Sequence, residues 1–544
     1  MNKKLLAVIP MLAIVGIATT GCRKKTASGD DPTKANLHVR TLNKGIGIKW
    51  LENAAEAFQN LYADSTEFQE GRTGVKVTII GDTSCDGDYL NNNVLNDDIY
   101  FTEQVQYRDL VNKGKLLDIS DVLGADLSAY GDAAGKTILS KLDATMENYL
   151  NHGGKYYGVP FYDSFYGLVY DVTLFKEKGF YLSNSGDFVS YDDPDLSVGS
   201  DGVAGTLDDG LPATYDEFDS LMRQICDSGV IPFITAQNAK EYIADYLFNV
   251  VADDEGVENM VMNINLSGDA EDLVNVVSED GTYTLKETSI AQNNGYELTR
   301  QVGRLHALQF LKNQMLGQTE SYKIYSTHTD AQREFVKKSR SSGKNFAMIV
   351  EGSWWENEAS GVLAAEAKKS GARDFAIMPI PFSSAKRAEE KNHRHTYLSL
   401  SQSFGIVSAS CSNQKLAKEF MKFLHSDKML SKFTADTSIT RPLNYEVSAE
   451  DQTKLSNYAK SLIYLKQHSD IVYPYSSLPI EVNNPSYFKH HKFIWRAVVD
   501  EKPYEHPWDY FTGDTTGDTE PRTVKKYFDG QYAFFSNAWA NLNK

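Results

Sequence analysis

The sequence predicts an α/β protein built from at least two lobes. Predicted strands and helices alternate along the chain, which is typical of lobes with a largely parallel sheet. The chain has 544 residues. About five hundred remain after the N-terminal leader and linker described below, too many for one hydrophobic core. The length therefore favours two or more separately folded bodies.

The N-terminus reads as an export signal. A basic run at residues 2–4 precedes an apolar segment over about residues 5–18, which is too short to span a membrane in the mature protein. Thr19-Thr20-Gly21 then leads to Cys22, an arrangement that resembles the lipobox of bacterial lipoproteins, where the chain is cut before a cysteine that receives lipid. Thr19 departs from the larger aliphatic residue that is commoner there. We expect residues 1–22 to be a lipoprotein signal and Cys22 the lipid anchor; the alternative is a plain signal peptide.

Residues 23–36 are polar and rich in turn formers, so we expect a flexible tether. No second apolar run is long enough to span a bilayer. The net charge is −18, or −20 without Lys3 and Lys4. Such an acidic body argues against nucleic acid and against a basic membrane-binding face, and it fits a soluble extracytoplasmic protein with an uncharged ligand.

Cysteine is scarce. Beyond Cys22 there are Cys85, Cys226 and Cys411, with no short spacing between any two. This excludes a disulfide framework and a CxxC site for zinc or redox chemistry. One disulfide is possible, but the pattern does not say which.

The first part of the chain alternates strand and helix. Apolar residues at helical spacing, from Trp50 to Leu61, predict a helix that begins near Lys49. A Lys-Gly-Lys break interrupts the predicted helix at 107–121. The predicted strands of this part are 37–42, 75–80 and 99–101.

The rest of the chain continues this alternation. Residues 155–175 combine strand, proline, aromatic turn and second strand, and Thr-Tyr-Asp-Glu marks a helix start near Thr214. Residues 253–300 are acidic and turn-rich, with a hairpin tip at 279–282. Further helices are predicted at 298–315 and 414–424, and further strands at 346–350, 374–379 and 404–407.

The order of these segments resembles the family 1 extracellular solute-binding proteins, the sugar receptors of ABC importers related to maltodextrin-binding protein. Eight pieces occur in the family's order behind the lipobox. They include WLENAAEAF after a strand and an Asn-Lys-Gly turn, DDIYF, YYGVPFYDS, GLVYD, LPATYDEF, AMIVEGSW, DFAIMPIP and LAKEFMKFL.

The resemblance implies a two-lobed periplasmic-binding-protein-like fold of type II, with a hinge between two α/β lobes. Lobe one would hold 36–160 and 402–446, and lobe two 161–401 and 447–544. A carbohydrate, on the length of the chain an oligosaccharide, would bind between the lobes, and closure would present it to ABC permease subunits. Such a receptor would be a monomer without a required cofactor, anchored by lipid outside the cell membrane.

Trp354 and Trp355 are the first candidate ligand contacts. They follow a strand and a glycine, at the carboxyl end where open α/β sheets bind ligands. An indole face matches the apolar face of a pyranose. Since family members carry a cleft tryptophan at the Gly-Ser-Trp position, we expect Trp354 in the cleft and Trp355 packed.

Two further turns follow predicted strands of lobe one. The resemblance places Asn43 and Lys44 at the cleft, and the alternative is a solvated loop. Glu103 and Gln104 follow the third strand at the equivalent edge. Carboxylates accept hydrogen bonds from sugar hydroxyls, so these residues are also candidates.

An aromatic and acidic turn coincides with the first expected hinge crossing. It contains Phe161, Tyr162, Asp163 and Phe165. A buried aspartate needs partners. We therefore expect one tyrosine and Asp163 to face the ligand.

An acidic, glycine-rich loop spans residues 201–210. Oxygen ligands on a tight turn suit calcium, with Asp201, Thr206, Asp208 and Asp209 as candidates. The loop lacks the EF-hand pattern. A bare acidic loop is the alternative to a structural calcium site.

Two other functions compete with the receptor. A secreted glycan-cleaving lipoprotein would need two carboxylates about 5–10 Å apart, which a chain with 73 acidic residues does not exclude. A glycan-binding adhesin would bind without hinge closure. No GxSxG, HExxH or P-loop motif is present, so the sequence favours a binding protein over an enzyme.

Overall fold

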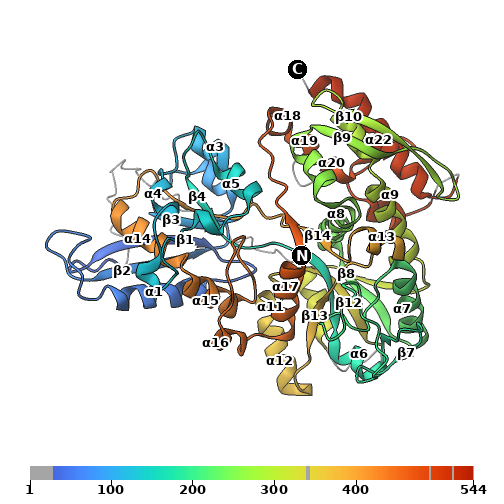
Figure 1. Ribbon diagram of the computed structural model, residues 1–544, viewed down its shortest axis with the longest axis horizontal. Helices are drawn as coiled ribbons and strands as arrows, with labels where there is room; N and C mark the ends of the chain where they lie inside the picture. Colours follow the sequence, from blue (N-terminus) through green and yellow to red (C-terminus); the bar gives the residue numbers. More distant parts are fainter. Residues whose placement is uncertain (1–28, 338–343, 489–491, 517–519, 543–544) are drawn as a thin grey trace, which may run out of the picture.

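The computed structural model describes residues 29–337, 344–488, 492–516 and 520–542. Two α/β bodies lie side by side, each with its own central sheet (Figure 1). The predicted signal and Cys22 lie outside the described residues. No helix in the described ranges has the length and apolar character needed to cross a bilayer.

Lobe one is built on a five-stranded sheet in the order β2-β1-β3-β15-β4. The first three of these strands run parallel, whereas β15 is antiparallel to β3 and to β4. Their bounds are β1 Ala35–Leu42, β2 Val75–Asp82, β3 Ile99–Thr102, β4 Gly158–Pro160 and β15 Phe404–Val407. The chain thus returns to this lobe late in the sequence to complete its sheet.

Helices cover the lobe-one sheet with apolar stripes. Helix α1 (Lys49–Leu61) buries Trp50, Leu51 and Phe58 at the predicted helical spacing. Helices α14 (Gln414–Leu424) and α15 (Asp427–Thr437) contact α1. The smaller helices of this lobe are α2 Gly87–Asn92, α3 Tyr107–Asn112, α4 Ser120–Leu123 and α5 Ala144–Leu150.

Lobe two has a second five-stranded sheet in the order β11-β8-β12-β5-β13. Strand β5 pairs antiparallel with both of its neighbours, and the other pairs are parallel. The bounds are β5 Tyr166–Asp171, β8 Ile231–Ala236, β11 Tyr322–Tyr325, β12 Phe346–Gly352 and β13 Phe375–Met378. The helix predicted near Thr214 is α7 (Tyr215–Asp227), and the Thr214 side chain accepts a hydrogen bond from the Glu217 N–H.

The remaining elements of lobe two surround this sheet. Two pairs of short strands, β6 with β7 and β14 with β16, add small sheets. The bounds are α6 Val172–Lys178, β6 Tyr181–Leu182, β7 Phe188–Val189, α9 Val302–Gln309, α10 His328–Val336, α11 Trp355–Glu358, α12 Ser360–Ser370, α13 Ala385–Glu390, β14 His395–Leu398, α16 Ala449–Gln452, α17 Asn457–His468 and β16 Ser469–Val472.

The stretch predicted as turn-rich, 253–300, differs from expectation at its start. Helix α8 (Lys240–Asn265) continues through it and bends at Gly256, whose φ of 78° favours glycine. The acidic residues that suggested a loop, such as Asp254 and Glu255, are buried and paired inside the lobe. The predicted hairpin is confirmed, because β9 (Gly268–Val277) pairs with β10 (Tyr283–Ile290) around a tip at 279–282.

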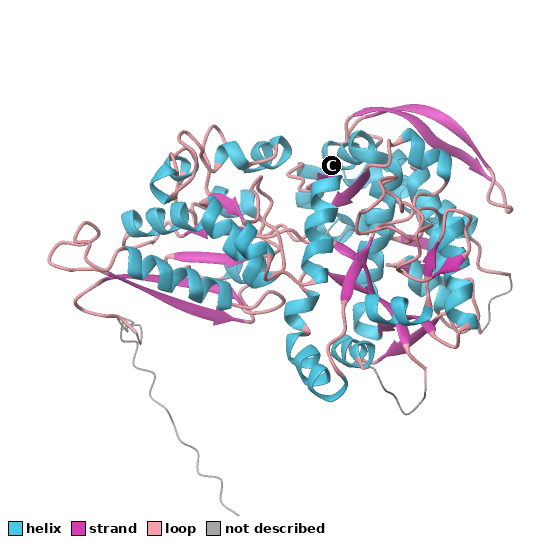
Figure 2. Ribbon diagram, turned by 60° about the horizontal axis from the view of Figure 1, so that its bottom comes forward, coloured by secondary structure: helices cyan, strands magenta, loops and turns pink. Residues whose placement is uncertain are grey.

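A C-terminal layer extends lobe two beyond its sheet. The long helix α22 (Val524–Leu542) lies beside the β9–β10 hairpin (Figures 1 and 2). The other elements are α18 Pro479–Asn483, α19 Pro485–Phe488, α20 Lys492–Trp495, β17 Ala497–Val499, β18 Lys502–Tyr504 and α21 Pro507–Thr512. Helix α18 lies beside the gap between the two lobes (Figure 1).

Each lobe has its own hydrophobic core, and the boundaries differ from the expected ones in two places. Tyr473 and Tyr475, expected in lobe two, pack in the core of lobe one. Helix α16 packs on α15, also in lobe one. The predicted tether ends early, because Asp31 and Asn36 exchange hydrogen bonds just before β1.

Candidate functional site

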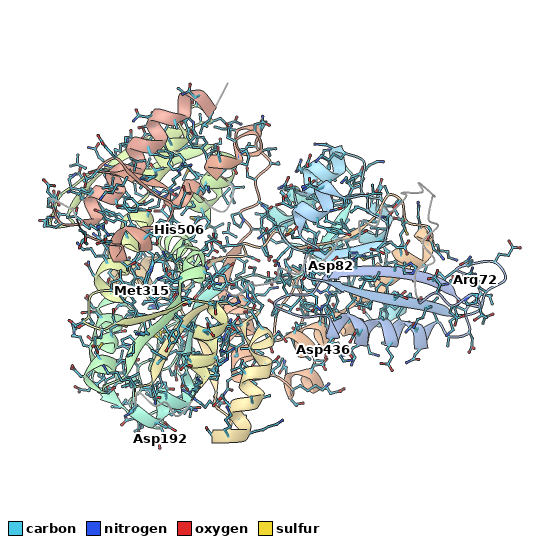
Figure 3. The ribbon with its side chains drawn as sticks, turned by 180° about the vertical axis from the view of Figure 1, so that it is seen from behind. Arg72, Asp82, Asp192, Met315, Asp436 and His506 are labelled. Atoms are coloured by element: carbon cyan, nitrogen blue, oxygen red, sulfur yellow. The ribbon has the colours of Figure 1, made fainter. Side chains whose placement is uncertain are left out.

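A cavity of about 1290 Å³ lies between the lobes. This is more than the roughly 300–1,000 Å³ of common small-molecule sites. Lobe one contributes the turns after β1 and β3, and lobe two contributes the start of α8 and the turn after β12. Residues of the 474–488 segment, including Glu481 on α18, form a further part of the wall. His506 belongs to the lobe-two side of this cavity (Figure 3).

Trp354 is an aromatic wall of the cavity. Its ring meets those of Tyr166 and Tyr242 edge-on, with centroids 5.2 and 6.0 Å apart. The indole lies against Gly352 of β12, where an added Cβ would come within 2.3 Å of Cη2. On the lobe-one side, a Cβ at Gly45 would come within 3.1 Å of the same side chain. Two glycines thus make room for an indole that reaches both lobes.

Trp355, the second candidate, is the packed member of the pair and does not line the cavity. Its side chain is fully buried in the lobe-two core. There it packs against Phe335, Phe375 and Tyr458. The chain turns into α11 directly after Trp354, which points consecutive side chains in different directions. Trp355 therefore supports the turn that holds Trp354.

Glu103, Gln104 and Lys44 all line the cavity from lobe one. The Tyr162 hydroxyl donates a hydrogen bond to the Glu103 carboxylate. Burial raises the pKa of Glu103 above its usual value, although this hydrogen bond acts in the opposite direction. Gln104 has a φ of 55°, and its N–H donates to the carbonyl of Ser401 at 2.8 Å. This strained position fixes the turn that carries both side chains.

The other predicted residues divide between the wall and the interior. Phe161 and Tyr162 line the cavity. Asp163 and Phe165 do not, and both are buried. Asp163 has its partners within the protein, at the hinge, and Phe165 packs beside Tyr397. Their assignment as ligand contacts is therefore corrected to a structural one.

Asn43 also falls outside the residues that line the cavity. Its backbone N–H donates to the Asp82 carbonyl at 3.1 Å, which ties the turn after β1 to the end of β2. The side chain is exposed on the lobe-one edge. Here the alternative of a solvated loop residue describes the structure better.

The sequence prediction missed the contribution of α8. Glu241, Tyr242 and Asp245 line the cavity from its first turns. These residues follow β8, a strand that the sequence analysis did not predict. Ligands bind beyond the carboxyl ends of strands in such sheets, so recognition of β8 is the signal that leads to them. Burial raises the pKa of Asp245 to about 8. Burial also raises the pKa of Glu481, on α18, to about 8.

The acidic loop at 201–210 lies in lobe two, away from the cavity. Asp208 is buried and accepts hydrogen bonds from the Ser200 N–H at 2.7 Å and the Thr206 hydroxyl at 2.7 Å. The Tyr464 hydroxyl donates to Asp201, and the Gly205 N–H donates to Asp209 at 2.7 Å.

No group of three or more His, Cys, Asp or Glu side chains with metal-holding geometry occurs in the described part of the chain. Calcium binding by Asp201, Thr206, Asp208 and Asp209 stays a prediction, which melting in calcium and in chelator would test. The three cysteines of the described ranges are free.

The arrangement suits recognition of a polyhydroxylated ring. The indole of Trp354 offers a flat apolar face, and carboxyl groups on both lobes offer hydrogen-bonding oxygens around it. A ligand held by groups from both sides would favour a closed form of the hinge.

Solved structures with the same fold include several sugar receptors. The GacH receptor of Streptomyces glaucescens, solved unliganded and with acarbose, aligns over 94% of this chain and 98% of its own, with a TM-score of 0.53 and 15% identity. RafE from Streptococcus pneumoniae aligns over 93% and 99%, with a TM-score of 0.53 and 14% identity. The cyclic α-maltosyl-1,6-maltose binding protein of Arthrobacter globiformis aligns over 93% and 100%, with a TM-score of 0.53 and 13% identity.

Sequence comparison gives the family. A search of curated proteins finds no match. The model of the bacterial extracellular solute-binding proteins matches residues 50–429, more than half of the chain and most of both sheets. With this match and the two-lobed fold, the chain belongs to the bacterial extracellular solute-binding protein family.

Proposed function

We propose that this protein is a lipid-anchored receptor that captures a carbohydrate between its lobes and delivers it to an ABC importer. The observation that carries the proposal is the exposed part of the Trp354 indole in a large cavity whose polar groups include Glu103 and Asp245. Cys22, outside the described residues, would carry the lipid.

An oligosaccharide fits this cavity better than a single sugar. The cavity volume, about 1290 Å³, leaves room for several rings. The aromatic wall and the 474–488 segment lie in the same cavity, so a chain of sugar rings would contact both. The related folds named above include a receptor solved with acarbose and a cyclic α-maltosyl-1,6-maltose binding protein, which supports this choice.

Binding without chemistry is the second part of the proposal. Family membership favours a receptor over a glycoside hydrolase. Cavity carboxyl groups such as Asp245 and Glu481 are held by burial at raised pKa values of about 8. In this state they donate and accept hydrogen bonds to hydroxyl groups.

The test is a calorimetric screen of neutral oligosaccharides, followed by chromatography of each mixture. We expect saturable binding of at least one oligosaccharide, with the sugar recovered intact. Release of shorter sugars would instead identify an enzyme. X-ray scattering with and without the bound sugar separates a receptor from an adhesin, because only hinge closure reduces the radius of gyration.

A further inference from the structure

The wall of the interlobe cavity is acidic. Two side chains that carry a positive charge line it, Lys44 and Arg108. Arg108 is already engaged, because its Nη2 donates to the carbonyls of Asn148 and Tyr149 on α5, at 3.3 and 3.1 Å. Six carboxyl groups line the same cavity: Glu103, Asp109, Glu241, Asp245, Glu358 and Glu481. The wall therefore has an excess of groups that can carry negative charge.

Two carboxyl groups of this wall, one from each lobe, are held by hydroxyl groups rather than by cations. The Tyr162 hydroxyl donates to Glu103, and the Tyr166 hydroxyl donates to Asp245. Lys44 attracts the Glu103 carboxylate more weakly than this hydrogen bond does. Among the described residues, no lysine or arginine acts on Asp245. Burial raises the pKa of both groups, and that of Asp245 reaches about 8.

A positively charged ligand would supply the missing counter-ion. In the free protein, the raised pKa keeps Asp245 largely protonated at neutral pH. A cation bound beside a carboxyl group lowers the pKa of that group, so Asp245 would ionise as the ligand binds. The bound state would then contain a charge-assisted contact, which is stronger than a hydrogen bond between two neutral groups.

Three aromatic rings form a corner of the cavity close to these two acids. The Trp354 ring meets those of Tyr166 and Tyr242 at interplanar angles of 88° and 81°, and the two tyrosine rings lie 5.5 Å apart at 63°. Burial, followed by the nearby carboxylates of Asp245 and Glu103, raises the pKa of Tyr166 well above its usual value, so both acids lie near this corner. The faces of tyrosine and tryptophan rings attract cations, which makes the corner a second source of attraction for a positive charge.

The rings and the acids are open to the cavity. Tyr166, Tyr242 and Trp354 are half-buried, and so are Glu103 and Asp245. All five line the cavity. A ligand held there can therefore contact the aromatic corner and both carboxyl groups together.

We propose that the carbohydrate captured in this cavity carries a protonated amine. The inference rests on the receptor function proposed above and narrows its ligand class. The sugar ring would stack on the indole of Trp354, and its ammonium group would lie near the tyrosine rings and the carboxylates of Glu103 and Asp245. Neutral oligosaccharides would bind in the same place by hydrogen bonds alone, and more weakly. An acidic sugar would be repelled by the wall.

The test is calorimetric titration of the purified protein at pH 7 with three matched pairs of sugars. The pairs are glucosamine and glucose, galactosamine and galactose, and mannosamine and mannose. The two members of a pair differ at C2, where one carries an ammonium group and the other a hydroxyl. We expect at least one amino sugar to bind about tenfold or more tightly than its parent hexose, the ratio expected from one charge-assisted contact. Absence of this preference in all three pairs would overturn the proposal.

Glucuronate provides the arm of opposite charge. We expect it to bind more weakly than glucose, because its carboxylate would meet an acidic wall. Binding of glucuronate as tight as that of glucosamine would also overturn the proposal.

Two variants locate the ammonium site. Glu103→Gln and Asp245→Asn keep the shape of each side chain and an oxygen that accepts from the neighbouring tyrosine. In each variant we expect the preference for the amino sugar to fall about fivefold or more, with less than a twofold change in affinity for the parent hexose. Glu67→Gln is the control, because Glu67 is exposed and pairs with Lys415 at 3.1 Å on the surface of lobe one; it should keep the preference. A preference that both cavity variants retain would refute the location.

The results also separate this inference from the receptor proposal. If neutral oligosaccharides bind but no amino sugar is preferred, the receptor function stands and the amine is wrong. If neither neutral nor amino sugars bind, the receptor function itself is contradicted.

Discussion

The ammonium group of Lys466 lies 2.8 Å from the Asp163 carboxylate at the place where the chain passes between the lobes. The Thr440 hydroxyl donates to the same carboxylate at 2.7 Å, and the Asp163 N–H donates to the Thr440 carbonyl at 2.8 Å. The Tyr473 hydroxyl also donates a hydrogen bond to the Asp163 carboxylate, at 3.4 Å. Three segments that link the lobes, around residues 163, 440 and 473, thus meet at one buried aspartate.

This geometry predicts that Lys466→Met destabilises the protein. Removing the lysine leaves Asp163 charged and buried, which costs about 3–5 kcal/mol in the free energy of unfolding. The measurement is urea denaturation. The matched control is Lys386→Met, since Lys386 is exposed and pairs with Glu390 at the surface at 3.2 Å; it should change stability by less than about 1 kcal/mol. Equal effects of the two substitutions would contradict the role of the hinge pair.

Alanine substitutions of the two adjacent tryptophans should affect different properties, ligand affinity at Trp354 and stability at Trp355. Trp354→Ala should weaken oligosaccharide binding about thirtyfold or more, as expected for loss of an aromatic contact worth about 2 kcal/mol, and should leave the fold intact. Trp355→Ala should instead cost about 3–5 kcal/mol of stability, because it opens a cavity in the core. Calorimetric titration and urea denaturation of both variants separate the roles. Unaltered affinity in the Trp354 variant would refute the proposed stacking surface.

Gly352 gives a second test of the same surface. A Cβ at this position would lie 2.3 Å from Cη2 of Trp354, so Gly352→Ala must displace the indole. We expect affinity for the oligosaccharide to fall at least tenfold, about 1.4 kcal/mol, with little loss of stability. Gly361→Ala is the control, because nothing lies within 4 Å of its added Cβ and alanine favours the helix there. If both variants bind alike, the position of the indole does not depend on Gly352.

Much of the fold was predictable because local patterns agree with the final packing. The apolar spacing of α1 and the cap at Thr214 are local signals, and both elements form where expected. Helix α8 was not predicted, because its acidic residues suggested an exposed turn. In the structure these side chains are buried and form hydrogen bonds with residues far away in the sequence. Asp254, for example, contacts His306 at 2.8 Å. Periodicity cannot anticipate such contacts.

The candidate site was predictable at the level of turns rather than of single side chains. The strand-end rule led to Glu103 and Trp354, which line the cavity. It could not say that Asp163 would find Lys466, some three hundred residues later, and so turn away from the ligand. The contribution of Glu481 depends on how the C-terminal layer returns to the gap between the lobes, which is a property of the tertiary fold.

The pH dependence of stability provides a test of the core beneath the cavity. Glu351, at the end of β12, is buried, and its Oε1 accepts from Gln332 Nε2 at 3.0 Å while Oε2 has no partner. Burial, followed by the nearby charge of Glu358, raises the pKa of Glu351 from 4.5 to about 8. The folded protein therefore keeps a proton that the unfolded chain releases above about pH 4.5. The free energy of unfolding should fall as pH rises through this window, by about 1.4 kcal/mol per pH unit for this one proton, until the folded-state pKa is passed.

Glu351→Gln removes that proton and keeps the side-chain shape. We expect the stability of the variant, measured by urea denaturation from pH 6 to 9, to fall less steeply than that of the wild type, so that the two proteins diverge as pH rises. Asp245 and Glu481, whose pKa values burial also raises to about 8, are present in both proteins and cancel in the difference. If the stabilities of the two proteins change with pH in parallel, Glu351 is ionised in the folded state. Its second carboxylate oxygen would then need a hydrogen-bond donor.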